Sequence, residues 1–127
     1  MINLKIKINH FKKGKKFLTL IINNKTIATD KLGYLKHLSD WNEQVAVAIA
    51  TLDNIVLTSV HWGIIYFLRN FYQEFQTTPP IRILVKEIEK KFGAEKGNSV
   101  YLHQLFPGGP AKQGCKIAGL PKPVKCI

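Results

Sequence analysis

The sequence predicts a mainly α-helical protein of the α+β class: a small helical bundle with an N-terminal β-hairpin and an extended, flexible C-terminal arm. Apolar residues recur at the three- to four-residue spacing of helices through the middle of the chain. A β-prone stretch with a turn and a return strand precedes them. Two prolines, Pro121 and Pro123, follow the last helical stretch and exclude a regular helix at the C-terminus.

The first thirty residues predict a basic segment and then the hairpin. Residues 1–16 are Lys-rich, with a short strand expected at residues 2–8. Residues 17–22 are apolar and β-prone, residues 23–25 supply an Asn-rich turn, and residues 26–29 return as the second strand. A loop then leads to the first helix.

Capping signals and apolar faces predict the first two helices. Asp40 has a Glu three residues later, as in a capping box, and the helix it starts runs to about residue 52. Thr58 or Ser59 caps the next helix, residues 60–75. The apolar stripe of this second helix makes it the expected central helix of the core.

Three shorter helices complete the predicted bundle. One covers residues 81–92, after two prolines and before a glycine. A short one, capped at residues 98–99, runs to residue 106. The last covers residues 111–118, with a proline at its start and Gly119 as its left-handed stop.

With 127 residues, 46% of them hydrophobic, the chain is expected to form one globular unit. We expect residues 1–16 to be a basic extension and residues 17–127 a single domain, with residues 119–127 as its mobile arm. No apolar run approaches the roughly 18 residues of a membrane span. The N-terminus also lacks a signal-peptide pattern. A cytoplasmic protein without membrane contact is therefore expected.

The net charge of +11 is concentrated at the two ends of the chain. Residues 1–16 carry six lysines and residues 96–127 carry five, with no acidic residue in either, whereas the middle is balanced. Basic ends can contact nucleic acid or an acidic protein. Only Arg69 and Arg82 are arginines, however, and a site that reads phosphate through paired hydrogen bonds favours arginine. A direct RNA contact is left open as a weak, secondary role.

Conventional catalytic patterns are missing from the sequence. It has no nucleophile elbow, phosphate-binding loop, dinucleotide-binding motif or CxxC pair. The four histidines are scattered, and His61, at the start of the central helix, is expected to be structural. Asp53 and Glu74 are expected to stand alone. Neither a metal nor an organic cofactor is expected.

The two cysteines are the remaining candidates for chemistry. Cys126 is the penultimate residue, on an arm in which Gly119, Pro121 and Pro123 favour an extended form. At ~3.1 Å per residue, the steps from Gly119 to Cys126 reach roughly 22 Å. Such an arm can place a thiol inside another protein's active site, although a stray terminal thiol is the alternative.

Two further features of this region leave alternatives open. Lys122 and Lys125 would favour the thiolate of Cys126 and help dock an acidic partner, whereas the terminal carboxylate would oppose the thiolate. Cys115 is either a small buried hydrophobe of the last helix or a resolving thiol that closes on Cys126.

Four stretches of the sequence resemble one family. They are GYL followed by a Trp (residues 33–41), LTSVHW (57–62), FLRNFYQEF (67–75) and KFGAEKGNSVYLHQLFPGGPAKQGCKIAGLPKPVKCI (91–127). Together they look like the DsrC/TusE family of sulfur-relay proteins, over about residues 18–127. The resemblance implies a helical domain with an N-terminal hairpin and a mobile arm, whose penultimate cysteine, here Cys126, carries sulfur as a persulfide.

The two branches of that family imply different partners. The TusE branch implies a sulfurtransferase that takes sulfur from a TusBCD complex and passes it to the tRNA 2-thiouridylase MnmA, which thiolates the wobble uridine of bound tRNA. We favour it because dissimilatory sulfite reduction is confined to specialised metabolisms. The DsrC branch implies a two-cysteine partner of dissimilatory sulfite reductase, in which Cys115 and Cys126 join across a trisulfide. TusE-like members often lack a cysteine at the position of Cys115. Outside the family, an RNA-binding module with incidental thiols is the third alternative.

Overall fold

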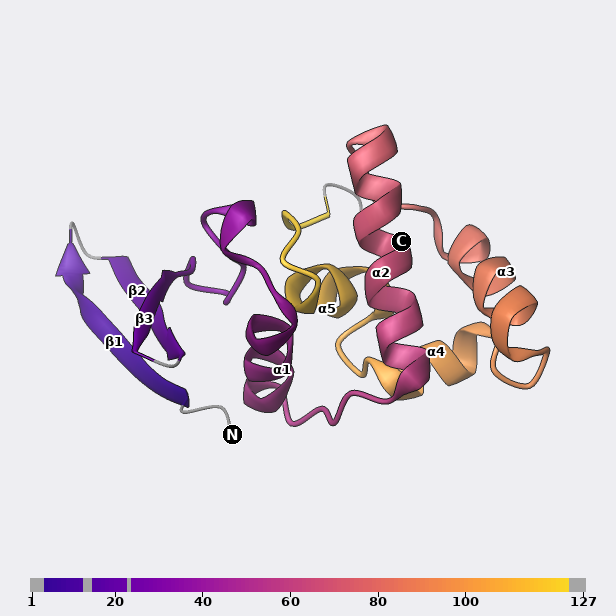
Figure 1. Cartoon of the computed structure of the whole chain (residues 1–127), viewed down its shortest axis with the longest axis horizontal. Coiled ribbons are helices and arrows are strands. Elements are labelled where there is room, and N and C mark those ends of the chain that lie inside the picture. Colours follow the sequence, from indigo (N-terminus) through magenta and orange to yellow (C-terminus); the bar gives the residue numbers. More distant parts are fainter. Residues whose placement is uncertain (1–3, 13–14, 23, 124–127) are drawn as a thin grey trace.

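The computed structural model of the chain describes residues 4–12, 15–22 and 24–123. A three-stranded antiparallel sheet lies at one end of the molecule and a bundle of helices at the other (Figure 1). The strands are β1 (Leu4–Lys12), β2 (Lys15–Ile22) and β3 (Lys25–Ala28), in the order β1-β2-β3. The predicted class, mainly helical with an N-terminal hairpin, is confirmed.

The predicted hairpin consists of β2 and β3, paired in a register that sets Leu20 opposite Ile27. Asn24, in the turn, has a left-handed φ of +67°, which Asn tolerates better than most residues. Leu20, Ile22 and Ile27 are buried and join the sheet to the core. β1 is longer than the short strand expected at residues 2–8, and it pairs with β2. Part of the basic extension therefore belongs to the sheet.

The helices of the described chain are α1 (Glu43–Leu52), α2 (Ser59–Phe75), α3 (Ile81–Phe92), α4 (Ser99–Leu105) and α5 (Pro110–Ile117). Their bounds agree with the predicted ones within the usual fraying of helix ends. One cap was predicted wrongly: Asp40 lies in a 3-10 turn, and the side chain of Asn42 accepts the hydrogen bond from the Val45 amide. Among the described residues, none of these helices combines the length and the apolar character that crossing a bilayer requires.

Helix α5 lies inside the bundle, in contact with α1, α2 and α4 (Figure 1). It approaches α2 closely at Gly114, where a Cβ would lie 2.9 Å from Leu68 Cδ1. Cys115, Ile117 and Ala118 have no solvent exposure. The last turn of α5, from which the C-terminal arm leaves, therefore lies against the core, whereas Lys112 on the same helix is exposed.

His61 has the structural role that the sequence predicted. The Thr58 amide donates to His61 Nδ1 at 3.0 Å, and His61 Nε2 donates to the Leu105 carbonyl at 3.0 Å. These two bonds select the neutral ring with its proton on Nε2. Burial lowers the pKa of His61, and the hydrogen bond to Leu105 opposes that effect. The side chain ties the start of α2 to the end of α4.

Candidate functional site

The arm begins at a Schellman motif that ends α5. Ala118 caps the helix, and Gly119 has a left-handed φ of +73°. The Gly119 amide donates to the Lys116 carbonyl at 3.3 Å, and the Leu120 amide donates to the Cys115 carbonyl at 2.9 Å. These are the two hydrogen bonds of this motif, and Leu120 and Cys115 also belong to the same buried cluster. The stop predicted at Gly119 is thus the one observed.

Two side chains from other elements hold carbonyls in the last turn of α5. Trp41 Nε1 donates to the Ile117 carbonyl at 2.9 Å, and Arg69 Nη1 donates to the Ala118 carbonyl at 2.7 Å. The Arg69 guanidinium carbon lies 3.8 Å from the centroid of the Trp41 ring, a cation–π contact. A Cβ on Gly119 would lie only 2.4 Å from Trp41 Cδ1, so the indole lies directly against the glycine. We call Trp41 and Arg69 the root clamp.

Neighbouring aromatic residues support the root clamp. The ring of Tyr66 meets that of Trp41 edge to face, with centroids 6.0 Å apart, and stacks with Trp62 at 6.1 Å. The Tyr66 hydroxyl donates to Glu43 at 2.7 Å, and this hydrogen bond raises the pKa of Tyr66. Burial lowers the pKa of Arg69, but an arginine remains charged at neutral pH. Side chains of α1, α2 and the segment before α1 thus converge on the start of the arm.

Cys115 lies in the core beneath the start of the arm. It has no solvent exposure, and its Sγ lies 3.6 Å from Thr78 Oγ1. Burial raises the pKa of the Cys115 thiol to about 11, against a smaller lowering by the Thr78 hydrogen bond. Because the thiolate is the nucleophile in sulfur exchange, both the burial and the raised pKa of Cys115 disfavour its reaction in this conformation at neutral pH. A reaction at Cys115 requires the end of α5 to open.

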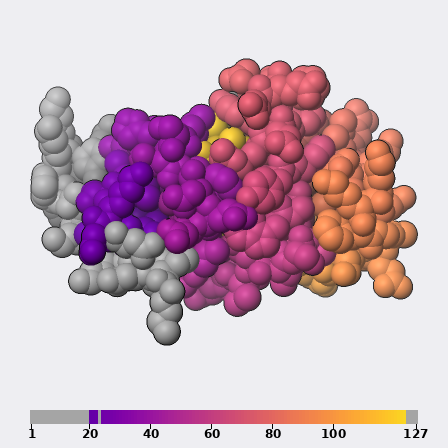
Figure 2. Space-filling view, in the orientation of Figure 1, coloured from indigo at the N-terminus to yellow at the C-terminus, as the bar shows by residue number. Residues whose placement is uncertain are grey.

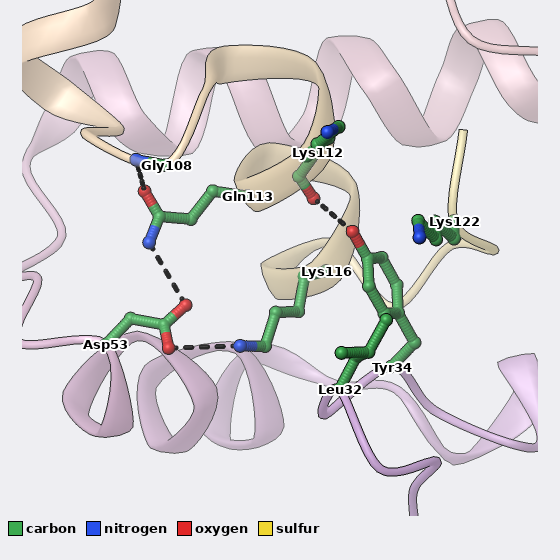
Figure 3. A pocket seen from close by; sticks show the side chains of 8 residues that line it. All are labelled: Leu32, Tyr34, Asp53, Gly108, Lys112, Gln113, Lys116 and Lys122. Atoms are coloured by element: carbon green, nitrogen blue, oxygen red, sulfur yellow. Dashed lines mark hydrogen bonds and ion pairs between the residues drawn. The ribbon is translucent and has the colours of Figure 1, made fainter. Parts of the chain in front are cut away.

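A basic pocket of about 280 Å³ lies beside the start of the arm (Figure 3). Lys112 and Lys116 of α5 and Lys122 of the arm line it, together with Asp53. Lys116 Nζ lies 3.0 Å from Asp53 Oδ1, and Gln113 Nε2 donates to Asp53 Oδ2 at 3.2 Å. The prediction that Asp53 stands alone is therefore wrong. Three ammonium groups against one carboxylate leave two positive charges in the pocket.

The predicted arm residues divide at the end of the described chain. Pro121 and Lys122 are exposed and Pro123 is half-buried. Figure 2 shows part of the C-terminal segment, in yellow, in a notch between the segment that precedes α1 and helix α2. Lys125 and Cys126 lie outside the described residues, so the role of Cys126 stays a prediction.

Sequence reasoning did not single out Trp41 and Arg69 as site residues, although one signal was present. Only two of the 19 basic residues are arginines, and the other one, Arg82, is exposed. A rare arginine on a core helix favours a position where a planar cation donates a hydrogen bond and lies over an aromatic ring, as Arg69 does. Within the described part of the chain, no three His, Cys, Asp or Glu side chains gather that could hold a metal ion.

Sequence comparisons connect the chain to known proteins. The family described as DsrC-like protein matches residues 21–127. A protein of Haemophilus influenzae named sulfurtransferase TusE homolog is 59% identical over 108 residues, which cover 85% of this chain and 99% of that protein. Sulfurtransferase TusE of Photorhabdus laumondii is 57% identical over 110 residues, which cover 87% of this chain and 99% of the relative.

Solved structures give the same result for the fold. DsrC of Allochromatium vinosum matches with a TM-score of 0.75 and 52% identity, covering 86% of this chain and 97% of that one. The oxidized gamma-subunit of the dissimilatory sulfite reductase (DsrC) from Archaeoglobus fulgidus matches with a TM-score of 0.77 and 38% identity, over 86% and 99% of the two chains. The predicted resemblance is confirmed: this chain belongs to the DsrC-like protein family, and relatives that are 59% identical to it over 108 residues are named sulfurtransferase TusE or sulfurtransferase TusE homolog.

Proposed function

We propose that this chain is a sulfur carrier in a sulfur relay, and that Cys126 takes a sulfur atom from a donor protein and delivers it to an acceptor. The burial of Cys115 is the observation that carries the proposal. Because burial raises the pKa of that thiol to about 11, sulfur exchange at neutral pH falls to Cys126, the other cysteine of the chain. The relatives named sulfurtransferase support this class of reaction.

The proposed transfer is thiol–disulfide exchange with one extra sulfur atom. The Cys126 thiolate attacks the terminal sulfur of the donor persulfide. The S–S bond of the donor breaks, its thiolate leaves with the electron pair, and a new S–S bond forms on Cys126. An acceptor thiolate then takes the terminal sulfur from Cys126 in the same way. Since one S–S bond replaces another, neither step consumes an external oxidant or reductant.

We further propose a TusBCD-like complex as the donor and the tRNA 2-thiouridylase MnmA, with bound tRNA, as the acceptor, in the cytoplasm. The name TusE borne by the relatives supports this branch. The basic pocket of Lys112, Lys116 and Lys122, continued in sequence by Lys125, suits an acidic side chain of a partner that receives the arm. RNA contact stays secondary, because the cations of this pocket are lysines.

A two-cysteine role is the second candidate, and the presence of Cys115 favours it. In that role the Cys115 thiolate attacks the inner sulfur of the Cys126 persulfide, which closes a Cys115–Cys126 disulfide and releases hydrosulfide. The two thiols supply the two electrons that reduce the released sulfur. The hydrogen bond from the Leu120 amide to the Cys115 carbonyl would have to break first, since it closes the last turn over the buried thiol.

Intact mass spectrometry tests the assignment. Reduced wild type, Cys126→Ser and Cys115→Ser are incubated with glutathione persulfide. We expect wild type and Cys115→Ser to gain one sulfur atom that dithiothreitol removes, and Cys126→Ser to gain none. Loading of Cys126→Ser would show that the carrier assignment is wrong. If Cys115→Ser loads but no longer releases hydrosulfide, the two-cysteine role gains support.

A further inference from the structure

We propose that Trp41 and Arg69, the root clamp, are positioning residues that aim the arm for sulfur transfer between proteins. This inference rests on the proposed carrier function of Cys126. The clamp touches neither the thiol nor the transferred sulfur. It acts through the Ile117 and Ala118 carbonyls, which it holds at 2.9 and 2.7 Å.

The geometry of the clamp is more specific than a helix end requires. Carbonyls in the last turn of a helix lack helical partners and are commonly left to water or to the residues that follow. Here the two donors come from the segment before α1 and from α2, far from α5 in sequence. Arg69 also places a positive charge at the negative end of the α5 dipole, and its contact with Trp41 couples the two donors.

The length of the arm makes its direction sensitive to the clamp. The sequence predicts an extended arm of roughly 22 Å from Gly119 to Cys126, and over that length a rotation of about 10° at Gly119 would displace the tip by roughly 4 Å. Transfer between two sulfur atoms depends on their approach within a few tenths of an ångström of the reactive geometry. A small donor diffuses to the thiol wherever it lies, whereas a protein donor needs the arm to enter its active site. Only sulfur transfer from a protein donor should therefore depend on the root clamp.

The first test compares a small donor with a protein donor. Arg69→Met removes the guanidinium group but keeps an apolar side chain of similar length. Trp41→Phe keeps an aromatic ring but removes the Nε1 donor. Arg82→Met is the matched control, because Arg82 is the other arginine and is exposed on α3. We expect kcat/KM for sulfur transfer from persulfidated TusBCD to fall about tenfold or more in both clamp variants. Loading by glutathione persulfide should stay within about twofold of wild type, and Arg82→Met should match wild type in both assays. Arg69→Lys should restore only part of the rate, because lysine keeps the charge but not the planar guanidinium that lies over the Trp41 ring.

A second test measures the position of the arm directly and needs no partner protein. In a Cys115→Ser background, one spin label is placed on Cys126 and another at Val100→Cys, an exposed position of α4. Double electron–electron resonance should give a broader or shifted distance distribution in Arg69→Met than in Arg82→Met. An unchanged distribution, or equal losses with the small and the protein donor, would overturn the positioning role. If wild type does not load from glutathione persulfide, the carrier function itself fails, and the spin-label distances still decide whether the clamp directs the arm.

Discussion

Replacing Gly119 with alanine should disrupt the start of the arm at a single point. At φ +73° an L-residue is about 1 kcal/mol less favourable than glycine. The new Cβ would also lie 2.4 Å from Trp41 Cδ1 and 2.8 Å from Trp41 Cβ, so the indole must move. Its displacement loses the hydrogen bond to Ile117, worth about 1 kcal/mol, and the cation–π contact with Arg69, worth about 0.5–1 kcal/mol. The free energy of unfolding should therefore fall by about 3 kcal/mol.

A double-mutant cycle separates the two contributions. Wild type, Gly119→Ala, Trp41→Ala and the double variant are unfolded in urea. Circular dichroism at about 222 nm follows the loss of helix. In the Trp41→Ala background the contacts with the indole ring are gone and only the approach of the two Cβ atoms at 2.8 Å remains, which a small shift of the chain relieves. Gly119→Ala should then destabilise by little more than the backbone contribution, about 1 kcal/mol. The expected coupling energy is thus about 2 kcal/mol. If the two substitutions are additive within about 0.5 kcal/mol, the close approach is not responsible and the reasoning on the root clamp is refuted.

Two further predictions concern buried titratable groups. In a Cys126→Ser background, native Cys115 should be alkylated by iodoacetamide far more slowly than a free thiol, because raising the pKa from 9.0 to about 11 lowers the thiolate fraction roughly 100-fold at about pH 7.5. Equal rates in native buffer and in urea would contradict the burial. Burial lowers the pKa of His61 in the folded protein, so the unfolded chain binds a proton at this side chain more readily than the folded one. The contribution of His61 to stability is therefore present above about pH 6.5 and is lost as the pH falls below that value. His103, which is exposed, is the control position. Urea unfolding should show a weaker loss of stability between about pH 7 and pH 5 in His61→Gln than in His103→Gln. Parallel curves of stability against pH for the two variants would refute this.

The helices were predictable because their signals are local. Prolines before α3 and at the start of α5, glycines after each of these helices, and an apolar stripe along α2 all act within a few residues. The error at the start of α1 has the same origin. Asp40 and Asn42 both suit an N-cap, and the choice depends on where the 3-10 turn ends and helical geometry begins, which a spacing rule does not reveal.

The sequence by itself determined the fold class, the family and the helix stop at Gly119, and it pointed to Cys126 as the carrier. Tertiary structure showed that Cys115 is buried in this conformation, because burial depends on what covers a helix face, and its role as a resolving thiol stays a prediction. It also paired Asp53 with Lys116 and brought Trp41 and Arg69 to the end of α5. Each of these contacts joins residues about 50 to 80 positions apart, as expected of side chains that meet only when the bundle closes. No local sequence pattern predicts such long-range contacts. The arm could therefore be predicted from the sequence, whereas the root clamp at its start could not.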